Sequence, residues 1–155
     1  MTEKNKPFTG GSIRLDNVLI VVDDLETMKA FFLDLGMELE GETSVEGSWV
    51  DQVVGLKNVR SDIVLLRTPD GHGKVELSKF HNPVAVKGES EHAPVNTLGI
   101  RRIMFTVENV DAVVARLRNH GAELVGDIAQ YKDVYRLCFV RGPEGIIVGI
   151  AQELG

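Results

Sequence analysis

Residues 22–36 read VDDLETMKAFFLDLG, and residues 107–121, which lie 85 positions further on, read VENVDAVVARLRNHG. Both segments place an Asp or Asn before similarly spaced apolar residues, and both end on glycine. An Asp or Asn can accept hydrogen bonds from the free amides at a helix start, and glycine ends many helices. The apolar i, i+3 and i+7 spacing is that of an amphipathic helix. The matched pairs are Asp24 and Asn109, Leu25 and Val110, Met28 and Val113, Phe32 and Leu117, Gly36 and Gly121, Glu38 and Glu123, and Leu39 and Leu124.

This recurrence predicts two related helices and two copies of one structural module around them. The first helix is expected to begin after Asp23 and Asp24 and to close at Gly36. The spacing of Asp23 and Glu26 fits a capping box, in which the two residues satisfy each other's free amides. The second helix is expected to run from residue 110 to residue 120.

Short stretches rich in β-branched residues surround both helices and predict strands. In the first copy they cover residues 13–22, 37–43, 59–67 and 74–80, with a short helical turn at 48–55. In the second copy a first strand carries Arg102, Met104 and Thr106, and later strands cover residues 123–130, 135–141 and 146–152. The turn PDG at 69–71 and the turn PEG at 143–145 precede the last strand of each copy. Both copies therefore read β-α-β-β-β, and the fold class is α+β.

The same patterns predict the boundaries of the modules. Residues 1–12 are polar and without periodicity, which is typical of a flexible leader. Module 1 spans residues 13–80, a linker with two prolines spans 81–98, and module 2 spans 99–153. Each module has about 55 to 70 residues, a size at which burial is marginal, so we expect one domain, 13–155, with a shared core.

Composition narrows the classes of function. The chain has 155 residues, 17 basic and 23 acidic, with a formal charge of −6 at pH 7, which argues against nucleic acid as a partner. The apolar runs are far shorter than the ~20 residues of a membrane helix. The single cysteine, Cys138, cannot form an intrachain disulfide, and the first six residues lack the apolar segment of a secretory signal, so we expect a cytoplasmic protein. No Walker loop, Gly-x-Ser-x-Gly or Gly-x-Gly-x-x-Gly motif favours nucleotide binding or hydrolysis.

The tandem β-α-β-β-β modules, the sequence VDDL at 22–25 and the turn PEG at 143–145 resemble the vicinal oxygen chelate superfamily. This superfamily includes glyoxalase I, methylmalonyl-CoA epimerase, extradiol dioxygenases, fosfomycin-modifying enzymes and bleomycin-resistance binding proteins. The resemblance implies a curved sheet around a cleft, a homodimer, and a divalent metal held by residues of the first and last strands of both modules.

Transferred onto this sequence, the four metal-binding positions are Asn17, Glu76, Arg102 and Gly149. Only Glu76 is a standard ligand for such a metal, because Arg102 is always cationic and glycine has no side chain. We therefore predict a protein without the usual metal centre and with no cofactor. A divalent metal stays open as an alternative if Glu76 acts together with His72 or His81.

Strand alternation suggests which side chains line the cleft. It places three groups on the concave side, namely Asn17, Leu19 and Val21; Glu76, Ser78 and Phe80; and Arg102, Met104 and Thr106. Arg102 would then lie where a metal would lie. We expect it either to pair with Glu76 or to bind an anionic or carbonyl group of a ligand.

Aromatic residues complete the predicted ligand site. Trp49 lies where this superfamily often builds a cleft wall, and Tyr131 and Tyr135 flank a turn. An indole in the core and structural tyrosines are the plainer interpretations. The predicted ligand-binding residues are Asn17, Leu19, Trp49, Ser78, Phe80, Met104, Tyr131 and Tyr135.

Two classes of function follow. In the first, the cleft binds a small organic ligand without turnover. In the second, as the resemblance to glyoxalase I or an epimerase implies, the protein is a metal-dependent lyase or isomerase. Glu76 then moves a proton next to a carbonyl while a metal or Arg102 stabilises the enolate, which makes these two the candidate catalytic residues. A dioxygenase-related enzyme with relocated ligands is a further form of this alternative.

Overall fold

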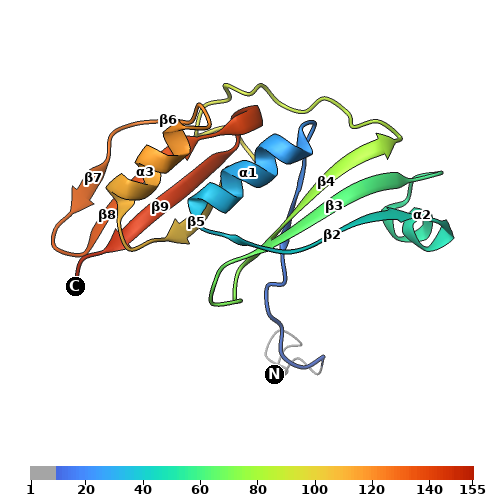
Figure 1. The fold of residues 1–155 in the computed structure, drawn as a ribbon, viewed down its shortest axis with the longest axis horizontal. Helices are drawn as coiled ribbons and strands as arrows, with labels where there is room; N and C mark the ends of the chain where they lie inside the picture. Colours follow the sequence, from blue (N-terminus) through green and yellow to red (C-terminus); the bar gives the residue numbers. More distant parts are fainter. Residues whose placement is uncertain (1–9) are drawn as a thin grey trace, which may run out of the picture.

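The computed structural model describes residues 10–155, so most of the predicted leader lies outside the described residues. Module 1 forms one sheet with the strand order β1-β4-β3-β2, in which β1 runs parallel to β4 (Figure 1). Its elements are β1 (Val18–Val21), α1 (Leu25–Leu35), β2 (Glu38–Glu46), α2 (Ser48–Val54), β3 (Arg60–Arg67) and β4 (Lys74–Asn82).

Module 2 repeats this arrangement in a second sheet with the order β5-β9-β8-β6, and β7 pairs with β8. Its elements are β5 (Arg102–Thr106), α3 (Val110–Arg118), β6 (Glu123–Leu124), β7 (Ala129–Tyr131), β8 (Tyr135–Arg141), the turn η2 (Pro143–Gly145) and β9 (Ile147–Glu153). The predicted α+β fold of two β-α-β-β-β modules is confirmed, and it is built from two hydrogen-bonded sheets.

Several predicted boundaries were wrong. The strand expected at 13–22 forms only over Val18–Val21, and residues 13–17 are not in a strand. The strand expected at 123–130 is divided into β6 and β7, because residues 126–128, which include Gly126, leave the ladder between them. The strand expected at 74–80 is two residues longer, since β4 continues to Asn82.

The start of α1 differs from the expected capping box. Asp24, and not Asp23, is the N-cap, and its Oδ1 accepts a hydrogen bond from the Thr27 amide at 3.0 Å. The Asp24 amide donates to Glu144 Oε2 at 3.0 Å, and the Asp23 amide donates to Glu144 Oε1 at 2.8 Å. Glu144 of module 2 therefore takes the part that a capping box would give to Glu26, and it joins the two modules.

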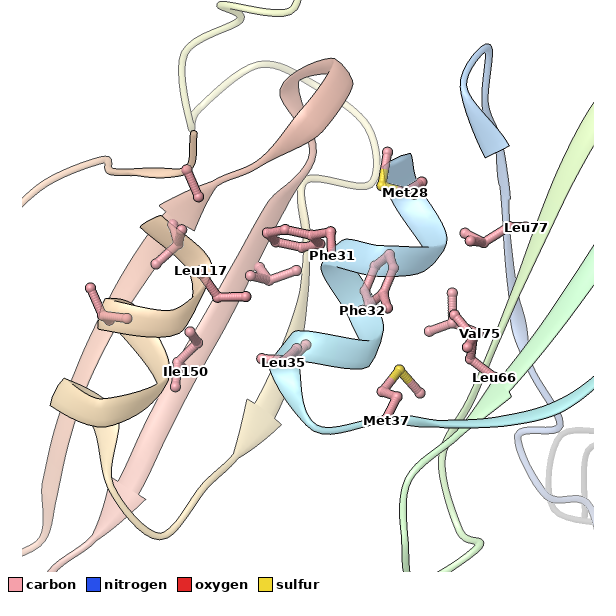
Figure 2. Packing of buried hydrophobic residues seen from close by; sticks show 14 of the residues in the cluster. Met28, Phe31, Phe32, Leu35, Met37, Leu66, Val75, Leu77, Leu117 and Ile150 are labelled. Carbon is pink, nitrogen blue, oxygen red and sulfur yellow. The ribbon is translucent and has the colours of Figure 1, made fainter. Parts of the chain in front are cut away.

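One hydrophobic cluster contains residues of both modules. Helices α1 and α3 lie side by side over the two sheets (Figure 1). Figure 2 shows Phe31 and Phe32 of α1 between the module 1 strands and Leu117 and Ile150 of module 2. Phe32 is fully buried, and its ring centroid lies 6.4 Å from that of Phe105 on β5.

A polar contact also joins α1 to the end of α3. His120 Nε2 lies 2.6 Å from Asp34 Oδ2, and Arg116 Nη2 lies 3.4 Å from Asp34 Oδ1. The hydrogen bond from His120, assisted by Arg116, holds the pKa of the Asp34 carboxyl below its usual value. These contacts therefore tie the end of α1 to the end of α3.

Candidate functional site

A cavity of about 770 Å³ lies between the two modules. Its walls are β1 and β5, each an edge strand of its sheet, together with linker residues 85–91 and residues 144–147 of the η2–β9 region. Apolar side chains such as Leu19, Ile20 and Ile103 make up much of the lining. Its volume is within the range of small-molecule sites, about 300 to 1,000 Å³.

Two arginines hold the linker against this cavity. Arg141 donates to the backbone carbonyls of Glu91 at 2.9 Å, Ala93 at 2.6 Å and Gly145 at 3.1 Å. Arg101 Nη2 forms an ion pair with Glu89 Oε1 at 2.7 Å. The linker is therefore part of the cavity wall and not a free tether.

The strand registers place the four positions of the expected metal centre. Leu19 of β1 lies opposite Glu76 of β4, and Met104 of β5 lies opposite Gly149 of β9. Because Leu19 and Met104 are equivalent in the two modules, Glu76 and Gly149 are equivalent too. Asn17, just before β1, is half-buried and donates from Nδ2 to Asp16 Oδ2 at 2.9 Å.

Arg102 packs on an aromatic ring. Its guanidinium carbon lies 4.2 Å from the centroid of the Phe139 ring on β8. Within residues 10–155 no ion pair joins Arg102 to Glu76, so the hypothesised pair is not found there. On the neighbouring strand β9, a Cβ added at Gly149 would collide with Met104 Sδ. Met104 therefore fills the space that a side chain at 149 would need.

The residues at the four expected positions are not the set of carboxylates and imidazoles that usually binds a divalent metal. One carboxylate, one amide, one guanidinium and a glycine stand at the four positions, and a guanidinium repels a cation. Among the described residues no group of three or more His, Cys, Asp and Glu side chains lies close enough together to hold a metal.

Of the two histidines considered as substitute ligands, His81 has a side-chain partner, and His72 is bonded through its backbone amide. The His72 amide donates to Asp70 Oδ1 at 3.0 Å in the turn before β4. His81 Nε2 lies 2.8 Å from Asp62 Oδ2. Hydrogen bonds from Ser44 and His81 lower the pKa of the Asp62 carboxyl, and the contact with His81 joins β3 to β4.

The remaining predicted ligand-binding residues are spread over the molecule. Ser78 is 3% exposed and its hydroxyl bonds to that of Ser61, while Phe80, two residues further along β4, is half-buried. Trp49 is exposed on α2, and Tyr131 pairs across the β7–β8 hairpin with Tyr135. Figure 1 shows α2 and this hairpin at opposite ends of the molecule, so one small ligand cannot contact all three aromatic residues. Of the predicted site residues, the cavity lining includes Leu19 and Arg102.

Sequence reasoning missed several residues of this region. Phe139, Arg101 and Arg141 and the linker wall were not predicted to take part. Strand alternation puts Phe139 and Arg141 on one face of β8, but it does not reveal that this face lies beside Arg102. Glu144 could have been singled out from the sequence, because it lies in the PEG turn on which the resemblance to the superfamily rests.

No helix within residues 10–155 is long and apolar enough to cross a bilayer.

Comparisons with known proteins agree with this architecture. The family model of the Glyoxalase/Bleomycin resistance protein/Dioxygenase superfamily matches residues 14–150. A glyoxalase family protein from Bacillus cereus is 47% identical, with a TM-score of 0.90, and the match covers 96% of this chain and all of that one. The protein YaeR of Escherichia coli (strain K12) is 25% identical over 92% of this chain and 98% of its own length. The antibiotic binding protein TnmS3 from Streptomyces sp. CB03234 shares the fold, with a TM-score of 0.58, 18% identity, and coverage of 94% and 99% of the two chains.

Proposed function

The chain belongs to the Glyoxalase/Bleomycin resistance protein/Dioxygenase superfamily, and from this premise we propose that it binds a small organic ligand between its modules without a resident metal ion. The cavity between β1 and β5 is the observation that carries the proposal. It combines an apolar wall with a few charged groups, which is the composition of most small-molecule sites.

The residues at the four expected metal positions support the proposal that the cleft has no resident metal ion. Arg102 adds a positive charge close to where a cation would bind, and Met104 occupies the room beside Gly149. Glu76 alone offers one carboxylate, whereas a divalent cation in a protein usually has two or more protein ligands. Restoring a second carboxylate at position 149 would require Met104 to move.

The Streptomyces antibiotic binding protein lends further support, because a chain of the same fold is there described as a binding protein. The lyase or isomerase alternative rests on Glu76, which is half-buried on β4 next to Leu19. It requires a metal or Arg102 to stabilise the enolate.

A thermal-shift screen tests the proposal. We expect an aromatic antibiotic or a related planar compound to raise the melting temperature equally in EDTA and in Ni²⁺, Mn²⁺ or Zn²⁺. By mass action, a ligand at a hundredfold excess over its Kd adds about 2.7 kcal/mol, or roughly 5 to 10 °C for a chain of this size.

Two leucine variants show whether the compound is in the cavity. Leu19→Gln changes a cavity residue that is 48% exposed, and Leu39→Gln changes a strand residue outside the lining that is 41% exposed. The shift should shrink in Leu19→Gln and persist in Leu39→Gln. Stabilisation by glutathione hemithioacetal that requires Ni²⁺ and disappears in Glu76→Gln would favour the lyase instead.

A homodimer, which the resemblance implies, stays a prediction. Exposed apolar side chains at Ile13, Leu98 and Ile100, on segments next to β1 and β5, offer surface that an interface would bury.

A further inference from the structure

We propose that the ligand is an organic oxyanion, with a carboxylate or phosphate that binds the guanidinium of Arg102 and an apolar body that lies along the cavity wall. This inference rests on the proposed function, because it names the chemical class of the ligand for the same cleft.

Arg102 is exposed on β5, and its guanidinium stacks on a neighbouring ring. Arg102 lies on β5 and Phe139 on β8, with β9 between them, so the arginine side chain spans β9 to reach the ring. Gly149 of β9 pairs with both Met104 and Phe139 and carries no side chain there. Its lack of a Cβ leaves room for the sulfur of Met104 next to the ring. The glycine therefore permits an arginine, a thioether and an aromatic ring to gather on one face.

Stacking on a ring leaves the edge of a guanidinium available. A guanidinium above an aromatic face is held by cation–π attraction, while its N–H groups point outward in its own plane. Within residues 10–155 the side chain of Arg102 donates no hydrogen bond and forms no ion pair. Such a preorganised fork matches the two oxygens of a carboxylate or phosphate.

The other guanidinium groups of the cavity are already engaged. Arg141 donates to three backbone carbonyls, and Arg101 pairs with Glu89. Arg101 Nε is in addition buried without a hydrogen-bond partner in the described part of the chain. A buried donor without an acceptor is costly, and an oxyanion that reached this nitrogen would supply its acceptor.

The acidic groups in the lining do not neutralise Arg102. Glu144 accepts from the amides at the start of α1, and Glu89 is paired with Arg101. The carboxylates of Asp23 and Glu91 are exposed to solvent, where water screens them. Leu19 and Ile103 in the lining, with Met104 beside Arg102, offer apolar contact to the rest of the ligand.

Isothermal titration calorimetry with matched probes tests this inference. The probes are 2-naphthoate, 2-naphthyl phosphate and the neutral 2-naphthamide, each titrated into the full chain in EDTA. We expect at least one anion to bind about 10- to 100-fold more tightly than the amide, as a charge-assisted pair provides. Arg102→Gln should remove that preference and leave the amide affinity unchanged within about twofold. Arg102→Lys, which keeps the charge and loses the fork, should retain part of it.

Arg60→Gln is the matched control, because Arg60 is an exposed strand arginine outside the cavity lining, and it should keep the full preference. The two anions distinguish carboxylate from phosphate as the bound group. Equal binding of all three probes, unaffected by Arg102→Gln, would overturn the oxyanion inference and leave the proposed cleft intact. Failure of every probe to bind, while the thermal-shift panel also yields no ligand, would overturn both.

Discussion

Phe32→Ala is expected to lower the free energy of unfolding by about 3 to 5 kcal/mol, the usual cost of removing a fully buried aromatic side chain. Phe32 packs on α1 against Phe31, at a centroid distance of 5.3 Å, and reaches Phe105 of module 2. The cavity left behind would therefore weaken packing in both modules. Val53→Ala on α2, at a position 79% exposed, should change stability by less than about 0.5 kcal/mol.

Two native probes report on the two modules during urea unfolding of this variant. Trp49 fluorescence follows module 1, and the reactivity of Cys138, which is buried on β8, follows module 2. Burial raises the pKa of the Cys138 thiol, so it reacts slowly until β8 opens. If the modules share one core, both midpoints should fall together. A fall in the Trp49 midpoint alone would show that the modules unfold independently.

Gly145→Ala should destabilise the protein by about 3 kcal/mol or more, through backbone strain and a clash together. Gly145 has φ +82°, a conformation that residues with a Cβ rarely adopt. An added Cβ would also lie 2.5 Å from the backbone oxygen of Glu91. Backbone atoms cannot rotate away as a side chain can, so the linker would have to leave the cavity wall.

Gly126→Ala is the matched control for this variant. Gly126 does not require a positive φ, and nothing lies within 4 Å of a Cβ added there. Its effect on the urea midpoint should therefore be small. A Gly145→Ala protein as stable as Gly126→Ala would contradict the described packing of the linker on η2.

The duplicated helix pattern allowed the fold to be predicted, because each helix carries its own cap, apolar stripe and stop in local sequence. Local sequence also placed β3, β4, β8 and β9 within about two residues, whereas β1 begins five residues later than expected. The amide partner at the N-cap of α1 was not predictable, since Asp24 and Glu144 lie 120 residues apart. The sequence suggested that Glu26 would accept from the free amide at the helix start, but in the folded chain Glu144 accepts there.

The candidate site was predicted only in part, because some of its contacts join residues that are far apart in the sequence. The residues at the four expected metal positions were identified from the resemblance, and the strand registers place Glu76 and Gly149 in equivalent positions. The partner of Arg102 was not identified, because Phe139 lies two strands away from it and sheet order decides that contact. The cytoplasmic location and the roles of Trp49 and the tyrosines stay predictions.

Elemental analysis tests most directly whether the cleft holds a resident metal ion. The protein is purified without chelators and then dialysed against Ni²⁺, Mn²⁺ or Zn²⁺. We expect far less than one divalent ion per chain, and the same trace content in wild type and Glu76→Gln. One tightly held ion per chain in the wild type, lost in Glu76→Gln, would contradict the account and make the metal-dependent lyase or isomerase the better description.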